Sequence, residues 1–392
     1  MTPLIVLALA TASATSAAGH GAARVAPASD TLARVGTHAI TSLDLIRRIE
    51  WMPWAGKQTG AAMDSAKARA LESLAGEQLL AQEAARLGLG ETGRVARMRA
   101  ALERALMRDA LYHDVVATAP QVTPAEVDRA LRSRPAPPTL EARRSLRRAV
   151  RDSLHALNER GRAIEFMQTT LASQRAEVDS ATFMLFADSL RALISASRET
   201  RATARGYATS AEDVDALLSR LAPDLDRPLV RLSGAPLTLG DALEDLRFYT
   251  LTIHSLQPRH FALELSTLFR GVVEGELMAR EGLRRGLDAR PEVRRDLAMW
   301  TDCWRAQLLI ERTRAGAPQS MAETRVTRLV AELAGRSRVA LDYPALQRTD
   351  VLPTDMVTKR LLGFGGGMLA APSLPPMWDW VPIWRAAQAP KP

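Results

Sequence analysis

Histidines, one cysteine and short polar motifs are the residues of this chain that could do chemistry. His254 and His260 are poorly spaced for two ligands on one helix face, and neither cysteine nor paired carboxylates lie near them in sequence. His113-Asp114 has the residue types of an acid–base pair, but with no third group in sequence a helix-surface pair is the simpler interpretation. Cys303 is the only cysteine, which excludes an intrachain disulfide.

Motifs that commonly mark enzymes are missing as well. The chain has no Gly-x-Ser-x-Gly nucleophile turn, no Gly-Lys-Ser/Thr phosphate loop and no Cys-x-x-Cys pair. The glycine run at 363–367 lacks the lysine and the following helix of a phosphate cradle. We therefore expect no catalytic residue, no metal site and no cofactor.

Composition predicts an ordinary soluble protein. The chain has 392 residues, 47% apolar and 24% charged, enough for two or three domains with sizeable cores. Its formal charge is +8, but almost all of its 52 basic residues are arginines and they are spread over every predicted helix, so we expect no nucleic-acid binding. Five of them, Arg143, Arg144, Arg147, Arg148 and Arg151, follow one another closely; we interpret them as a solvated helix face, with a site for an anionic partner as the alternative.

The first 23 residues resemble a secretory signal peptide. A short apolar run, LIVLALA, precedes small residues, and Ala10-Thr11-Ala12 and Ser16-Ala17-Ala18 fit cleavage sites, although no Lys or Arg precedes the run. No other stretch approaches a transmembrane helix. We expect a periplasmic or secreted protein without stable membrane insertion.

One stretch predicts a helix at the centre of a bundle. In LESLAGEQLLAQEAARLGL (71–89), Leu80 and Leu87 lie on one side of the helix and Leu71 and Leu74 lie nearly opposite, so apolar neighbours are needed on more than one side. Gly88 is a natural left-handed stop for this helix.

A second copy of this pattern lies 198 residues further on. LLAQEAARLGL (79–89) and LMAREGLRRGL (277–287) agree at six of eleven positions. Upstream, Ile40-Thr41 and Asp44 match Leu237-Thr238 and Asp241. The repetition indicates two related units.

The chain therefore divides into five predicted segments. They are a signal peptide (1–23), a first helical module (30–180) with a long returning helix (140–175), a helical connector (181–225), a second module (226–345) and a mostly irregular tail rich in Pro, Gly and Trp (346–392). Further helices are expected at 91–117, 237–251, 260–285, 289–314 and 321–335, and a short capped helix is expected to open at Val122-Thr123-Pro124.

The order of these patterns resembles a known family. VGTHAITSLDL, then ALESLAGEQLLAQEAARLGLG, then VTPAEVDRAL resemble the N-terminal chaperone domain of the SurA-type periplasmic foldases, over about 30–133. The resemblance implies a mostly α fold: two related SurA N-terminal-like helical modules with short β-strands, plus the irregular tail.

One part of the family pattern is missing. In that family a parvulin isomerase domain normally follows the VTxxEV helix, whereas here only a proline-rich linker separates Leu131 from Leu140. The resemblance therefore implies an exported chaperone that binds unfolded secreted or outer-membrane polypeptides in apolar clefts, without isomerase chemistry. Two alternatives stay open, a degenerate peptidyl-prolyl cis–trans isomerase and an assembly subunit with a single dedicated partner, and the chain could also form a dimer.

Two residue groups are candidates for these contacts. Soft methionines and a tryptophan suit promiscuous client binding, with ordinary core filling as the alternative; they are Met52, Trp54, Met63, Met98, Met107 and, less centrally, Met167. Aromatic residues of the tail are candidates for docking on the protein's own groove or on a partner; they are Phe364, Trp378, Trp380 and Trp384.

Overall fold

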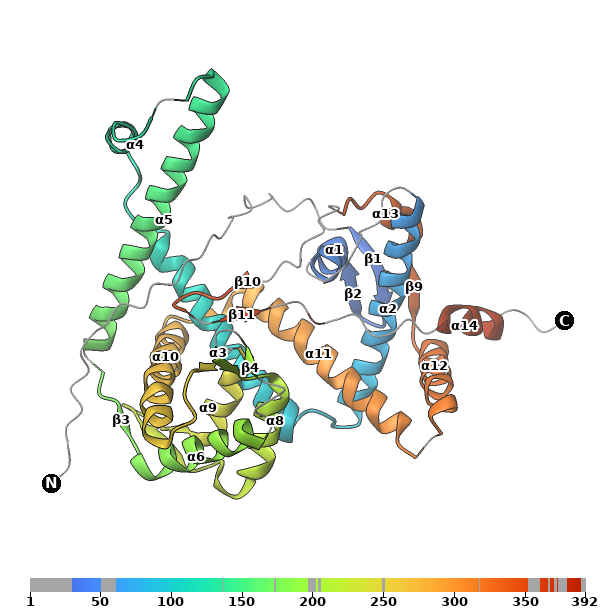
Figure 1. Ribbon diagram of the computed structural model, residues 1–392. Helices are drawn as coiled ribbons and strands as arrows, with labels where there is room; N and C mark the ends of the chain where they lie inside the picture. The colour runs from blue at the N-terminus through green and yellow to red at the C-terminus, as the bar shows by residue number, and fades with distance from the viewer. Residues whose placement is uncertain are drawn as a thin grey trace.

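The computed structural model is mostly helical with a few short antiparallel strands, which confirms the predicted fold class at that level (Figure 1). It describes residues 30–50, 61–135, 137–172, 174–196, 202–203, 206–248, 251–316, 318–351, 360–365, 367–369, 372 and 379–388. The predicted signal peptide and the candidate residues Met52, Trp54 and Trp378 lie outside the described residues.

The described helices include two 24-residue helices and three longer ones. They are α1 (Ser42–Glu50), α2 (Ala61–Arg86), α3 (Gly93–Val116), α4 (Pro124–Leu131), α5 (Leu140–Ala172), α6 (Ser180–Ala196), α8 (Ala211–Arg220), α9 (Leu239–Asp245), α10 (Pro258–Arg284), α11 (Pro291–Arg314), α12 (Gln319–Arg336), α13 (Tyr343–Gln347) and α14 (Trp380–Gln388), with 3-10 turns η1 (Ala222–Asp224), η2 (Leu246–Phe248) and η3 (Leu287–Ala289).

The described strands are short and all of their pairings are antiparallel. They are β1 (Thr31–Val35), β2 (His38–Thr41), β3 (Glu177–Val178), β4 (Ala202–Thr203), β5 (Gly206–Ala208), β6 (Pro228–Arg231), β7 (Leu237–Thr238), β8 (Thr252–Ile253), β9 (Val339–Leu341), β10 (Arg360–Leu361) and β11 (Met368–Leu369). They form sheets in the orders β2-β1-β9, β3-β6-β7, β4-β5-β8 and β10-β11.

Local signals in the sequence place several helix ends. The Thr41 hydroxyl accepts the N–H of Asp44 at 3.3 Å and opens α1, and Thr238 accepts the N–H of Asp241 at 3.1 Å and opens α9. Gly88 has φ +70° just after α2 ends, because the left-handed turn there suits a residue without Cβ. The long helix predicted over 140–175 is α5, about 50 Å at 1.5 Å per residue.

One prediction of local structure is wrong. The stretch 237–251, expected as one helix, contains β7, the short α9 and η2, since Thr238 caps the chain only after it has formed a strand with β6. Among its described residues, the tail contains the β10–β11 hairpin and the apolar helix α14.

Short strands are exchanged between distant parts of the chain. β9 pairs with β1, so a strand near residue 340 completes the sheet that begins at residue 31. β3 pairs with β6 in the same antiparallel sense and joins the end of the first predicted module to the start of the second. Both predicted modules begin with two strands and a short helix, β1-β2-α1 and β6-β7-α9. That they are copies of one structural unit stays a prediction.

The buried apolar residues form two cores. The terminal core joins β1, α1 and α2 to α12, α13 and α14, and the middle core joins α3 to α6, α8, α9 and α10. α11 contributes Val293 and Leu297 to the middle core and Leu309 and Ile310 to the terminal core. Each core therefore combines residues from both predicted modules, so the two segments pack into one another.

One part of the chain projects from the rest. Figure 1 shows α4 and the first half of α5 extending away from the helices of both cores, and we call 120–160 the arm. Only Val150 and Ala163 are buried along the whole of α5, while Leu140 is 64% exposed and Leu157 is 59% exposed. The apolar pattern that predicted α5 is therefore only partly covered.

Candidate functional site

The residues first considered for chemistry do not form a reactive site. The His254 ring and backbone N–H both contact the carboxylate of Glu264 on α10. His113 is mostly exposed, and Asp114 forms an ion pair with Arg290 at 2.6 Å rather than with the histidine. Within the described part of the chain no group of three or more His, Cys, Asp or Glu side chains is placed to hold a metal ion.

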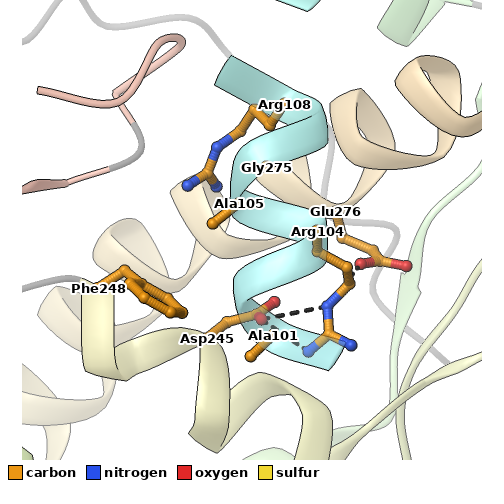
Figure 2. A pocket seen from close by; sticks show the side chains of 8 residues that line it. All are labelled: Ala101, Arg104, Ala105, Arg108, Asp245, Phe248, Gly275 and Glu276. Carbon is orange, nitrogen blue, oxygen red and sulfur yellow. Dashed lines mark hydrogen bonds and ion pairs between the residues drawn. The ribbon is translucent and has the colours of Figure 1, made fainter. Parts of the chain in front are cut away.

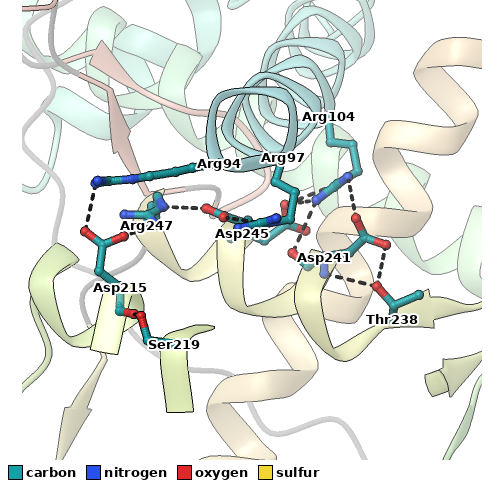
Figure 3. Close-up of polar contacts among 10 residues, drawn as sticks. Arg94, Arg97, Arg104, Asp215, Ser219, Thr238, Asp241, Asp245 and Arg247 are labelled. Atoms are coloured by element: carbon teal, nitrogen blue, oxygen red, sulfur yellow. Dashed lines mark hydrogen bonds and ion pairs between the residues drawn. The ribbon is translucent and has the colours of Figure 1, made fainter. Parts of the chain in front are cut away.

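A network of arginines and carboxylates joins α3 to α9 (Figure 3). Arg104 of α3 lies 2.7 Å from Asp245 and 3.3 Å from Asp241. About two turns earlier on α3, Arg97 lies 3.4 Å from the buried Glu244. These bonds fix α3 against α9, because each buried carboxylate needs a cationic partner at this position.

The centre of this network has a shifted pKa but no room for a substrate. Burial raises the pKa of Asp245 to about 6, against the opposing effect of Arg104. Figure 2 shows both side chains at a small cavity that Arg108, Phe248 and Glu276 also line. Its volume of about 10 Å³ holds roughly one water molecule. Perturbed carboxylates often mark active sites, but this enclosed one serves the packing of α3.

The β10–β11 hairpin packs against α3 and α5, and we call the surface that it covers on these two helices the groove. The buried carboxylate of Asp109 accepts the backbone N–H of Gly363 at 2.9 Å. Phe364 lies edge-on to Tyr112 with ring centroids 5.4 Å apart and stacks on Phe166 at 6.1 Å. The groove therefore contacts the turn of the hairpin through one main-chain hydrogen bond and two aromatic surfaces.

The hairpin fits this groove only with glycine at position 363. A Cβ added there would lie 2.1 Å from the Cβ of Tyr112, far inside any real contact, and helix α3 cannot yield at an atom next to its own backbone. The following residue, Phe364, has φ +52°, a left-handed conformation that costs an L side chain about 1 kcal/mol or more. Docking of the Phe364 ring offsets that strain.

A second groove runs along the arm between α4 and α5. Its volume is about 280 Å³, and its lining residues are Val122, Glu126, Arg129, Ala130, Leu154 and Asn158. The capping box of Thr123 and Glu126 fixes the start of α4, and Asn158 donates to the carbonyl of Pro120 at 2.9 Å. These polar bonds hold the two helices side by side while the groove stays open to solvent.

The candidate methionines lie mainly in the interior. Met63 and Met107 are buried, and Met98 is partly buried against the middle core. Met167 also packs against the middle core. Their positions match the alternative of ordinary core filling.

The candidate aromatic residues of the tail contact this chain itself. Trp380 and Trp384 are buried against α2 and α12, and the centroids of their two rings are 5.7 Å apart. The Trp380 Nε1–H donates to the carbonyl of Glu72 at 3.2 Å. Gly76 provides the space for the Trp380 ring. Phe364 lies instead in the groove at the middle core, so the tail contacts both cores.

Sequence reasoning found Phe364 but missed the groove that binds it. The one available signal was on α3, where Asp109 falls at the position at which the apolar stripe of Leu102, Ala105 and Leu106 should continue. A carboxylate in an apolar stripe needs a specific partner. The partner lies 254 positions away, beyond the reach of pattern arguments.

Comparison with family models, with curated proteins and with solved structures finds no match for this chain. The candidate site is therefore argued from its own geometry. Among the helices that the structure describes, none combines the length and apolar character needed to cross a membrane.

Proposed function

We propose that this protein is an exported chaperone that binds unfolded polypeptides in the groove on α3 and α5, without isomerase chemistry. The observation that carries the proposal is the occupant of that groove, the turn of the chain's own apolar β10–β11 hairpin, where Gly363 and Phe364 make the contacts. The chain's own hairpin would then stand where a client segment binds.

The groove's contacts suit many clients. Asp109 accepts a backbone N–H, a group that every non-proline residue carries, so its hydrogen bond does not select a side chain. Tyr112 and Phe166 present flat apolar surfaces that tolerate different side chains. Burial raises the pKa of the Tyr112 hydroxyl, so the ring stays neutral. Recognition of main chain and apolar character supports binding without sequence specificity.

Release of the hairpin tests the proposal. Gly363→Ala places a methyl group against Tyr112 and should expel the hairpin, because the clash is with an atom of the helix. We expect the wild type to suppress aggregation of several unrelated unfolded proteins and the variant to do so more strongly. The matched control is Gly161→Ala on α5, where an added Cβ meets nothing within 4 Å. Failure of both the wild type and Gly363→Ala to suppress aggregation would refute the proposal.

Substitution of a groove residue should weaken client binding, whereas release of the hairpin should strengthen it. Phe166→Ser removes one of its aromatic surfaces and should weaken client binding, whereas Ile164→Ser, at an exposed position on the same helix, should leave it unchanged. Far-UV circular dichroism and melting establish that both variants fold. Equal client binding by the two serine variants would contradict the assignment of the groove.

Two other outcomes would point elsewhere. Faster refolding of a proline-limited substrate would favour a degenerate isomerase, and recovery of one stoichiometric partner would favour an assembly subunit. Export is tested by cell fractionation with the full chain, and retention in the cytoplasm would contradict that part of the proposal.

A further inference from the structure

The tip of the arm concentrates basic side chains. Between residues 129 and 151 the chain has eight arginines and one acidic residue, Glu141. Arg147 is paired with Asp128 of α4 at 2.5 Å, and Arg143 donates to the carbonyl of Pro137 at 2.9 Å. These two arginines therefore help to hold the arm together.

Three arginines beside them have no such role. Arg144, Arg148 and Arg151 are exposed, and none has a hydrogen bond or ion pair within the described part of the chain. At 100° per residue they fall within about 60° of one another on α5, and they span roughly 10 Å of helix. We call them the arginine stripe. Like charges one turn apart repel, so this arrangement costs a little folding stability and calls for a partner.

The arm's groove continues the stripe. Leu154 follows Arg151 by one turn on α5, and Asn158 follows Leu154 by another, so the 280 Å³ groove begins where the stripe ends. Val122 and Ala130 supply further apolar lining from the α4 side. One side of α5 thus offers cationic contacts first and apolar contacts directly after them.

We propose that the arm docks an acidic polypeptide segment of a partner protein, with carboxylates on the arginine stripe and an apolar side chain in the groove between α4 and α5. Arg144 and Arg148 are about 6 Å apart along the helix, which matches carboxylates one turn apart on a helix or two residues apart on an extended chain. Guanidinium groups bind carboxylates in a bidentate manner, so three of them select for such a pattern.

Other anionic partners fit the arm less well. Single-stranded nucleic acid is held by aromatic side chains that stack on bases, and residues 117–165 contain no Phe, Tyr or Trp. A helix lying on a membrane needs an apolar face along its length, whereas between Leu140 and Leu157 α5 exposes no large apolar side chain. The groove accepts one apolar side chain rather than a lipid surface.

Binding of a defined peptide to the full chain tests this proposal. The probe is a fluorescent helical peptide with glutamates one turn apart and a terminal leucine, and its neutral counterpart has glutamine at each glutamate. We expect the acidic peptide to bind with an affinity that falls as salt rises, because the contacts are exposed ion pairs. The triple variant Arg144→Glu, Arg148→Glu, Arg151→Glu should bind it at least about tenfold more weakly, equivalent to about 1.4 kcal/mol.

The control is a second triple variant that changes the net charge of the protein by the same amount at positions outside the arm. Arg259→Glu, Arg294→Glu, Arg295→Glu alters three exposed arginines on α10 and α11 and should leave peptide binding within about twofold of wild type, since these sites lie outside the arm. Equal weakening by both triple variants, equal binding of the neutral peptide, or tighter binding of a single-stranded oligonucleotide or of anionic phospholipid vesicles would overturn the proposal. This inference does not rest on the chaperone groove, because the Gly363 and Phe166 variants leave the arm intact and test the groove alone.

Discussion

Arginine has opposite surroundings in the α3–α9 contact and on the arm. Arg104 is largely buried and lies 2.7 Å from Asp245, so its charge is compensated inside the protein. Arg144, Arg148 and Arg151 face solvent and form no ion pair with an acidic group in the described structure. The same residue type thus stabilises the fold in one region and leaves binding capacity in the other. Composition alone, which counts all 52 basic residues together, cannot separate the two uses.

A second difference lies between the two capped helices α1 and α9. Six and seven residues after its capping threonine, α1 carries Arg47 and Arg48. At the same distance from its own capping threonine, α9 carries Glu244 and Asp245. Arg47 pairs with Asp296 of α11 and Arg48 pairs with Glu77 of α2, whereas Glu244 and Asp245 pair with Arg97 and Arg104 of α3. Positions at the same spacing from the two caps therefore carry opposite charges and have partners of opposite charge.

The largest expected effect is at the buried pair Arg48–Glu77. Arg48→Met should lower the free energy of unfolding by about 3–5 kcal/mol, because it leaves the Glu77 carboxylate buried without its bidentate partner. Urea denaturation measures the loss. Replacing both residues with apolar side chains should recover most of it. A loss from Arg48→Met no larger than that from Arg148→Met on the arm would contradict the contrast between the two regions.

The next effect is the pH dependence caused by Asp245. Because burial raises its pKa to about 6, the folded protein binds the proton more tightly than the unfolded chain does. As pH falls from above 6 towards the unfolded value near 4, this group therefore adds stability, at most on the order of 3 kcal/mol. Above pH 6 that contribution is absent.

Comparison with Asp245→Asn isolates this term, since other carboxylates titrate alike in both proteins. The wild type should gain stability relative to the variant as the pH is lowered, measured by urea denaturation at each pH. A difference in stability that stays constant across this range would show that Asp245 keeps an ordinary pKa.

The third effect concerns Cys303, which lies beside the Arg48–Glu77 pair. Burial, together with the Glu77 carboxylate, raises the pKa of its thiol to about 12. Alkylation at neutral pH should be at least about a hundredfold slower in the folded protein than in denaturant, because the thiolate is the reactive form. Equal alkylation rates for folded and unfolded wild type would show that the Cys303 thiol is as accessible to solvent as the side chains of the arm, and not enclosed in a core.

The sequence predicts the elements of this fold better than their partners. Hydrophobic spacing and capping residues located α2, α5 and the opening of α4, since these signals act within one or two turns. The exchange of β3 and β9 could not be predicted, because strands of two or three residues carry almost no pattern. Nor could the mixed cores, since an apolar helix face does not specify which helix covers it.

The same limit applies to the candidate sites. Met63 and Met107 were chosen for their chemistry, but burial depends on neighbours that the sequence does not name. The arginines of α5 were interpreted as a solvated face, and only the positions of α4 and of Pro137 in the folded chain show which of them already have partners. Asp109 and Gly363 meet across 254 positions, and only the folded chain brings them together.

The smallest expected effect is on the arm, where removing an arginine should raise the free energy of unfolding, whereas removing the buried Arg48 lowers it. Arg148→Gln removes the middle one of three like charges, each about one turn from the next on an exposed face, so it should raise the free energy of unfolding by about 0.2–0.5 kcal/mol for each repulsive pair removed. Urea denaturation at low salt detects the gain, and higher salt should abolish it because the repulsion is screened. Arg147→Gln, one position earlier, breaks the contact with Asp128 and should not stabilise the protein. A loss of stability from Arg148→Gln would mean that this guanidinium already has a partner within the fold, and the arm would then lack the free charge that docking requires.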